Sequence, residues 1–284
     1  MSKSCIFSKI NYQNGQALLI VVLIMVVALT VGLSIASKSI TSLRNSSYQA
    51  SSQKALFAAE AGIEQALKSN STDNIIAEGF TNIYQGTEYK TDVFIVRGND
   101  FLLNGGNPVL QNSGIDLWLT DYSSESAELY KIPYSGSTFS VYWGSDFTAC
   151  NNAAMEVVVI TGTKITPLIS KYVYDPCESR RSGNNFSACS SDGSQRCTFA
   201  TVNAGGKTFY YKANIPAASG LVARVVPLYM STVVGITASV DSPLPSQGKV
   251  ISSIGKSGST ERQVNVFQGY SELPIEYFYN LFLP

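Results

Sequence analysis

The strongest hydrophobic pattern in the chain is an apolar segment near its N-terminus. Residues 17–36 are almost all Ala, Leu, Ile, Val and Met, and no charged residue lies between Lys9 and Lys38. A helix of about 20 residues, rising about 1.5 Å per residue, spans a hydrocarbon layer of about 30 Å. Because a backbone in lipid must satisfy its own polar groups, the pattern predicts a transmembrane helix that ends at about residue 37.

The helical pattern continues beyond the apolar segment. Residues 39–68 contain no Pro and only one Gly, and residues 53–67 are rich in strong helix formers. One helical face carries Leu56, Ala59, Ile63, Ala66 and Leu67. We therefore expect a single helix over residues 16–69, with its first half in lipid and its second half packed against a globular domain.

Residues 70–284 show shorter apolar runs, separated by clusters of Gly, Asn, Ser and Pro. The predicted strands are residues 87–97, 114–122, 139–143, 155–160, 165–174, 207–215, 221–229, 233–240 and 262–270. The aromatic C-terminus, residues 275–283, is expected to be a final buried strand, or alternatively a docking edge for a neighbouring subunit. Residues 180–194 are interpreted as a loop. The predicted fold class is α+β: one long N-terminal helix followed by a large antiparallel β-rich domain.

The cysteines are consistent with an exported domain. Cys5 precedes the apolar segment, which leaves four cysteines with three possible pairings. A predicted hairpin that turns near Gly162 brings its two flanking cysteines together, and the other two then close a small polar loop. The expected disulfides are therefore Cys150–Cys177 and Cys189–Cys197. A zinc site is the alternative, but the spacings contain no Cys-x-x-Cys pair, so no metal is assigned.

Catalytic signals are few. The chain has no His, which excludes Ser-His-Asp and Cys-His mechanisms. A carboxylate pair drawn from Asp116, Asp121, Glu125 and Glu128 could act as the acid and base of a glycosidase. Calcium could be bound near Asp146, Asp175 and Asp192, although no EF-hand spacing is present. We assign no catalytic residue and no cofactor, and we expect the chain not to be an enzyme.

Two further motifs give no ligand. Gly255-Lys256-Ser257 ends like a phosphate-binding loop but lacks the first glycine of that motif, and it is interpreted as a β-turn. Lys and Arg number 20 and Asp and Glu also number 20. Without a basic stripe beside exposed aromatic residues, no nucleic-acid partner is expected.

Two pieces of the N-terminal region together resemble a known family. The first is Gly15 followed by Gln16-Ala17-Leu18-Leu19-Ile20, and the second is Phe57-Ala58-Ala59-Glu60-Ala61-Gly62-Ile63-Glu64. This region resembles type IV minor pilins of the PilX-like group and, more distantly, the pseudopilins of type II secretion. The resemblance covers roughly residues 9–67. The motif positions that it marks are Phe57, Ala59, Glu60, Gly62, Ile63 and Glu64.

The resemblance implies processing and assembly. A prepilin peptidase would cut between Gly15 and Gln16, remove the basic leader of residues 1–15, and methylate the new amine of Gln16. An assembly platform would then move the helix from the membrane into a bundle of other pilins. There Leu18, Leu19, Val22, Leu23, Val26 and Leu29 would pack against equivalent helices.

The chain departs from the pattern of major pilins in two places. Gln16 replaces the usual Phe at the first mature position, and Ile20 replaces the Glu that follows the cut by five residues. A buried Glu needs a partner charge, whereas Ile20 offers only apolar packing. This difference suits a minor or tip subunit.

The sequence thus predicts a minor pilin-like subunit of a type IV pilus or a related filament. It would be a single-pass protein of the cytoplasmic membrane, with the N-terminus cytoplasmic and the domain of residues 70–284 outside, on the cell surface after assembly. One alternative is a membrane-anchored surface protein that binds a ligand without polymerising, and another is a surface glycosidase. An ordinary cleaved signal peptide is a further alternative for the N-terminal segment.

Overall fold

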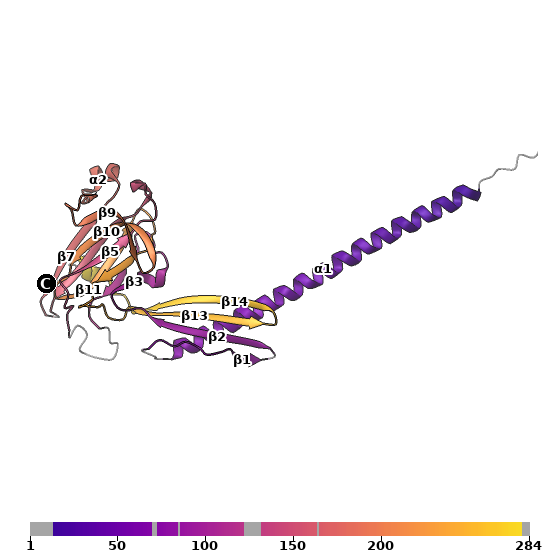
Figure 1. Cartoon of the computed structure of the whole chain (residues 1–284), viewed down its shortest axis with the longest axis horizontal. Helices are drawn as coiled ribbons and strands as arrows, with labels where there is room; N and C mark the ends of the chain where they lie inside the picture. Colours follow the sequence, from indigo (N-terminus) through magenta and orange to yellow (C-terminus); the bar gives the residue numbers. More distant parts are fainter. Residues whose placement is uncertain (1–13, 70–72, 85, 122–131, 164, 280–284) are drawn as a thin grey trace, which may run out of the picture.

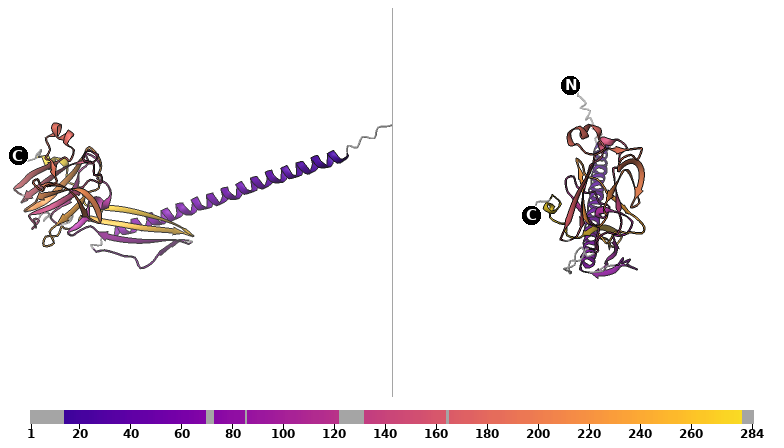
Figure 2. Two further views of the ribbon diagram at one scale, coloured as in Figure 1. Left: turned by 45° about the horizontal axis from the view of Figure 1, so that its top comes forward. Right: turned by 90° about the vertical axis from the view of Figure 1, so that its left-hand side faces the viewer.

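A computed structural model describes residues 14–69, 73–84, 86–121, 132–163 and 165–279. Helix α1 (Asn14–Lys68) is a single rod of 55 residues, as the absence of Pro and the helix-forming residues of its second half predict. The β-rich body lies at the C-terminal end of this rod (Figure 1). The left view in Figure 2 shows the same arrangement, with the N-terminal part of the rod free of the body. The predicted α+β fold class is confirmed.

One four-stranded sheet packs against the second half of α1, and we call it the helix sheet. Its strands are β1 (Thr81–Tyr84), β2 (Thr87–Ile95), β13 (Gly248–Ser257) and β14 (Thr260–Gly269), in the order β1-β2-β13-β14. All neighbouring pairs are antiparallel. The two central strands, β2 and β13, are separated by about 150 residues of sequence, so the sheet forms only when distant parts of the chain meet.

Small residues allow α1 to approach this sheet closely. The buried helix face carries Ala55, Ala58, Ala59, Gly62 and Ile63. A Cβ added at Gly255 of β13 would collide with the backbone carbonyl of Ala55 and the backbone nitrogen of Ala59. Only glycine at this position therefore lets the strand lie against the helix.

The predicted helix face was wrong in one respect. Leu56 is 38% exposed, and Ala55 occupies the buried place beside Gly255. The periodicity located the buried face of the helix to within one residue. The strand lies so close to the helix at Gly255 that the small side chain of Ala55, and not that of Leu56, fits between them. Of the predicted face, Ala59 and Ile63 are buried, Ala66 is half-buried and Leu67 lies at its edge.

The remaining strands form a two-layered sandwich inserted between β2 and β13. One layer has the order β3-β12-β5-β10-β9-β8 and the other β4-β11-β6-β7. The strands of the first layer are β3 (Asp100–Leu102), β5 (Thr138–Trp143), β8 (Cys189–Ser190), β9 (Cys197–Ala204), β10 (Lys207–Pro216) and β12 (Gly235–Ala238). Those of the second are β4 (Ile115–Trp118), β6 (Ala154–Gly162), β7 (Pro167–Tyr174) and β11 (Gly220–Leu228).

The main core lies between these two layers. Phe139, Trp143 and Ile215 extend into it from the six-stranded layer, and Met155 and Val157 from the four-stranded layer. Short helices occupy the connections: η1 (Leu103–Gly106), η2 (Ala149–Asn151) and α2 (Glu178–Asn184). Apart from the short parallel pair β8 and β9, the strand pairs of the sandwich are antiparallel within the described chain.

The C-terminal segment covers the outer face of the four-stranded layer instead of forming the predicted final strand. Residues Ile275–Tyr279 form the 3₁₀ helix η3, and Phe278 packs with Trp118, Val158 and Ile160. Leu273 is fixed through its backbone, because its N–H donates to Asp116 Oδ2 at 2.6 Å and its carbonyl accepts from Arg224 at 2.6 Å. Residues 280–283 of the predicted strand lie outside the described residues.

Two other local predictions were wrong. Gly255, Lys256 and Ser257 belong to strand β13, and the chain turns only after them. Residues 180–194 include most of α2, whose Arg180 binds the buried carboxylate of Asp175 at 2.7 Å. An ion pair and a helix thus order residues 180–184, whereas residues 185–194 contain only the two-residue strand β8 and otherwise agree with the predicted loop.

The other predicted strands are confirmed, with small shifts at their ends: β2, β4, β5, β6, β7, β10, β11, β12 and β14. Strands β1, β3, β8, β9 and β13 were not predicted. In β13 the face toward α1 combines the apolar Ile251 with Lys249, Ser253 and Gly255, so the strand lacks a regular alternation of apolar and polar residues.

Candidate functional site

The candidate site is α1 itself, and its first part has no partner within the chain. Gly15 and Gln16, the predicted cleavage residues, lie in its first helical turn. From Leu18 to Ala50 every residue is exposed. Leu18 is 71% exposed, and side chains on all sides of the helix are similarly uncovered. In water such a surface is unfavourable, at roughly 25 cal/mol for each Å² of apolar area.

The predicted packing residues belong to this uncovered surface. By helical period they form one broad face, and each is exposed in the single chain: Leu18, Leu19, Val22, Leu23, Val26 and Leu29. Ile20, at the position where major pilins carry Glu, is also exposed. The structure thus leaves all of these apolar side chains available to lipid or to other helices.

Among the described residues, α1 is the one helix long and apolar enough to cross a membrane. None of its apolar window is buried by the rest of the chain, which distinguishes it from a core helix. This exposure fits membrane anchoring.

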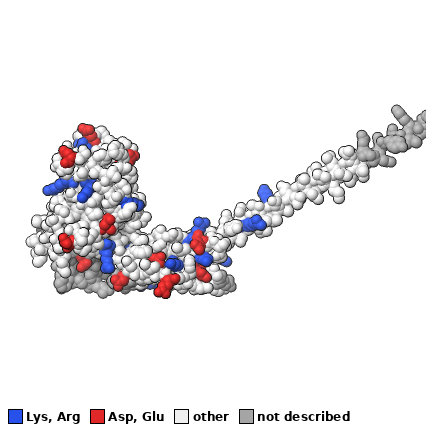
Figure 3. All heavy atoms as spheres, viewed as in Figure 1, with Lys and Arg blue, Asp and Glu red and all other residues white. Residues whose placement is uncertain are grey.

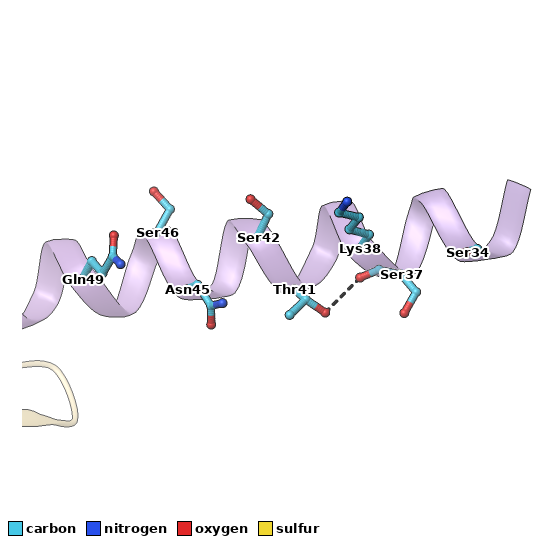
Figure 4. A pocket seen from close by; sticks show the side chains of 8 residues that line it. All are labelled: Ser34, Ser37, Lys38, Thr41, Ser42, Asn45, Ser46 and Gln49. Carbon is cyan, nitrogen blue, oxygen red and sulfur yellow. Dashed lines mark hydrogen bonds between the residues drawn. The ribbon is translucent and has the colours of Figure 1, made fainter. Parts of the chain in front are cut away.

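A polar stretch separates the apolar part of α1 from the helix sheet, and we call residues 37–50 the spacer. Its side chains are mostly Ser, Thr, Asn and Gln, with Lys38 and Arg44 as its charged residues. Figure 4 shows eight side chains of this region, Lys38 among them, pointing outward from a bare helix. The hollow along Ser34, Ser37, Thr41, Asn45 and Gln49 is open surface and not an enclosed cavity. Thr41 donates to the carbonyl of Ser37 at 2.9 Å, a bond within the helix.

The family motif in the second half of α1 divides between two faces. Ala59, Gly62 and Ile63 are buried against the helix sheet, where a Cβ at Gly62 would meet the hydroxyls of Thr91 and Ser253. Phe57, Glu60 and Glu64 lie on the opposite face and are exposed. The motif therefore combines residues that hold the domain with residues that face outward.

Three residues that sequence reasoning missed fix the packed half of α1. Lys249 Nζ donates to the carbonyls of Ala66 at 3.2 Å and Ser69 at 2.9 Å, which satisfies acceptors at the end of the helix. Arg262 Nε donates to Ser52 Oγ at 2.7 Å, where the helix first meets the sheet. The third residue is Gly255, which has no side chain and so allows β13 to lie against the helix backbone at Ala55 and Ala59. All three come from strands nearly 200 residues away, and no local signal links them to the helix.

The candidate catalytic carboxylates are not brought together as a free pair. Asp116 is buried and accepts from Arg224 Nε at 2.7 Å and from the backbone of Leu273. Burial raises the pKa of Asp116, while its hydrogen bond to Arg224 acts in the opposite direction. Burial, with the nearby charge of Asp116, also raises the pKa of Glu272. Asp121 is exposed, and Glu125 and Glu128 lie outside the described residues.

The aspartates considered for calcium have other roles. Asp146 accepts from the backbone of Thr148, and Asp175 binds Arg180. Asp192 accepts from the backbone of Ser194 at 2.9 Å, and this bond, together with hydrogen bonds to the side chains of Ser194 and Ser190, lowers the pKa of Asp192 to about 2. No group of three or more potential metal ligands occurs in the described part of the chain.

Both expected disulfides are present in the sandwich. Cys150–Cys177 joins η2 to the start of α2, and Cys189–Cys197 joins β8 to β9. The β6–β7 hairpin brings the first pair together, with Met155 opposite Tyr174, as its symmetry about the turn predicts. Each crosslink typically contributes about 2–4 kcal/mol to folding. They stabilise the end of the sandwich where α2 lies (Figure 1).

Comparison with known proteins identifies the N-terminal region only. Residues 14–64 match the PilX N-terminal family, so this part of the chain is a PilX-like type IV pilin N-terminal region. The match ends at Glu64, the last residue of the exposed part of the motif. No curated protein and no solved structure matches the chain.

Proposed function

We propose that this protein is a minor pilin-like subunit of a type IV pilus or a related filament, with a structural role. One observation carries the proposal: a pilin-type helix exposes its whole apolar first half, while its second half is packed against the protein's own sheet. A water-soluble protein would bury such a surface, since exposed apolar patches of this extent mark membrane or protein contacts.

In this proposal the apolar half of α1 occupies the membrane before assembly and a helical bundle afterwards. The exchange needs no new apolar burial, because hydrocarbon and neighbouring helices surround the same side chains. Lipid provides no hydrophobic driving force between helices, so association depends on packing and on specific polar contacts. The sandwich, at the opposite end of the molecule from Gln16, would then decorate or cap the filament.

The residue at position 20 favours a minor over a major subunit. Ile20 supplies no carboxylate to pair with the N-terminal amine of a neighbouring subunit. A filament built only from this chain would therefore lack that charge pair along its length. By analogy with the family, a prepilin peptidase and an assembly platform are the partners that process and extract the chain.

The mature N-terminus tests this proposal directly. Mass spectrometry of the protein from its native membranes should find a chain that starts at Gln16 with a methylated amine. A chain that keeps residues 1–15 would instead indicate a permanently anchored surface protein. A chain that starts near Lys38 would indicate secretion after signal cleavage, and the assembly role would be lost.

A further inference from the structure

Strand β7 lies at one edge of the four-stranded layer, and part of its free side is open in the described chain. The layer has the order β4-β11-β6-β7, so β7 is paired along its length on one side only. Near its end, the carbonyl of Val173 accepts from the backbone N–H of Ser187, so the backbone of Val173 faces the free side. Because backbone groups alternate along a strand, those of Ile169 face the same way. They have no hydrogen-bond partner among the described residues.

Apolar side chains mark the same part of this edge. Ile165 is 90% exposed and Leu168 is 67% exposed. Ile169 packs from β7 against the apolar cluster around Phe278. An edge that combines open backbone groups with exposed apolar side chains is a site where other chains pair and aggregate, and folded proteins commonly cover such edges. Covering this part of β7 would therefore stabilise the molecule.

The C-terminal segment approaches this edge from the far side of the layer. Leu273 is bonded to Asp116 of β4 and to Arg224 of β11. Phe278, further along the chain, packs with Ile160 of β6. The segment thus crosses the strands of the layer in the order in which they lie in the sheet, and β7 is the next strand.

We propose that residues 280–284 lie extended along the free side of β7 and pair with it at Ile169. Ile160, which packs with Phe278, is the β6 residue opposite Ile169. Neighbouring strands are about 4.8 Å apart, so the free side of β7 is about 10 Å beyond β6. Five extended residues reach about 17 Å, which is enough to cross β7 and pair with its free side.

The sequence of residues 280–284 suits this position. It reads Asn-Leu-Phe-Leu-Pro and carries no charged side chain. Its three apolar side chains match the exposed Ile165 and Leu168. Pro284 has no N–H to donate, and proline within sheets is confined largely to edge strands, where it hinders the addition of a further strand. The layer would therefore end in a short strand that offers little to another chain.

A segment of the same chain is favoured over another molecule as the occupant. It follows Tyr279, at the end of a helix that contacts β6, and a short tether gives it an effective concentration of about millimolar at the edge. Among the described residues drawn in Figure 3, positive and negative side chains are interspersed over the body, so charge does not favour a separate partner. The contact lies within one chain and does not depend on filament assembly.

Hydrogen exchange of the full-length protein in detergent tests the pairing. Deletion of residues 280–284 should speed exchange of the Ile169 amide about fivefold or more, because this amide loses its hydrogen bond. The amide of Ser170 points toward β6 and is the matched control, which should change much less. Mass spectrometry with fragmentation to single residues measures both amides. Unchanged exchange at Ile169 would overturn the proposal.

A charge substitution separates loss of the pairing from general loosening of the segment. Phe282→Asp should speed exchange at Ile169 as the deletion does, because a carboxylate is unfavourable against an apolar edge. Ile275→Asp places the same charge at an exposed position of η3, before the chain reaches β7, and should leave Ile169 unchanged. Equal effects of the two substitutions would contradict a specific contact at this edge.

A photo-crosslinking probe identifies the occupant directly. Benzoylphenylalanine in place of Phe282 should link within the same chain to residues 165–173. The same probe in place of Phe147, an exposed residue near Cys150 and away from the turn of the β6–β7 hairpin, should give no such link. Links from position 282 to a second chain, to lipid or only to another part of the sandwich would overturn the proposal.

Discussion

The two halves of α1 share one continuous helix but have opposite surroundings. In the second half, Ala55, Ala59 and Gly62 are buried because a strand lies directly against them. In the first half, residues that are much more apolar are fully exposed. Apolarity therefore does not decide which half is buried within the chain. Side-chain size decides where the sheet can approach, and the large apolar residues remain for partners outside the chain.

The largest expected effect comes from placing a charge in the exposed half. Val26→Lys puts a cation near the middle of the predicted membrane segment, which costs about 3 kcal/mol in insertion. We expect less of the protein in the membrane fraction and no assembled subunits, with no change in the melting of the β body. Fractionation of cells and thermal melting in detergent measure the two effects.

Leu56→Lys is the control for that substitution. Leu56 is an exposed apolar residue on the same helix but lies in the packed half. Membrane partitioning should not change, because this position lies beyond the apolar segment. Full membrane retention and assembly of the Val26→Lys protein would show that the first half is not a membrane segment.

A second prediction tests the close contact in the packed half. Gly255→Val places side-chain atoms where the backbone of Ala55 and Ala59 lies, so the helix and the strand must separate. We expect a loss of about 2–3 kcal/mol in the free energy of unfolding. Gly32→Ala is the matched change in the exposed half, where a Cβ meets nothing within 4 Å. It should leave stability unchanged or raise it by about 0.5–1 kcal/mol. Equal effects of the two variants in denaturant titrations would contradict the difference between the halves.

The smallest effect is expected at the end of the packed half. Lys249→Met removes the ammonium that binds the carbonyls of Ala66 and Ser69. The last turn of α1 should fray, with a loss of about 1 kcal/mol. Hydrogen exchange of the amides in that turn measures the change. Lys256→Met, on the other side of the same strand, should leave those amides protected.

Local patterns predicted α1, most strands and the two disulfides. The absence of Pro and the many helix-forming residues predicted the helix over its whole length, and Gly162 marked the turn of the hairpin that aligns Cys150 with Cys177. These features depend on residues close together in the sequence. The apolar first half could likewise be recognised as a contact surface without knowledge of the fold.

The rest depends on contacts between distant residues. The position of Leu56 could not be predicted, because the choice between it and Ala55 depends on the approach of Gly255. Strand β13 was missed because its face toward α1 has Ile251 as its apolar residue among Lys249, Ser253 and Gly255, which breaks the alternating pattern. The C-terminus was assigned to a strand because of its aromatic residues, but Phe278 instead covers a sheet whose two sides are both apolar. No local pattern indicated that the sandwich is inserted between β2 and β13.

This insertion has a consequence for the order of folding. The chain makes α1 first, but the helix has no complete sheet to rest on until β13 and β14 have been synthesised. The whole sandwich lies between β2 and β13 in the sequence, and its two connections to the helix sheet leave from these adjacent strands. A chain interrupted after Ala238 but before Gly248 would contain every strand of the sandwich yet lack β13 and β14, so the second half of α1 would lose most of its sheet, and a fully docked helix reports that synthesis has reached the final hairpin.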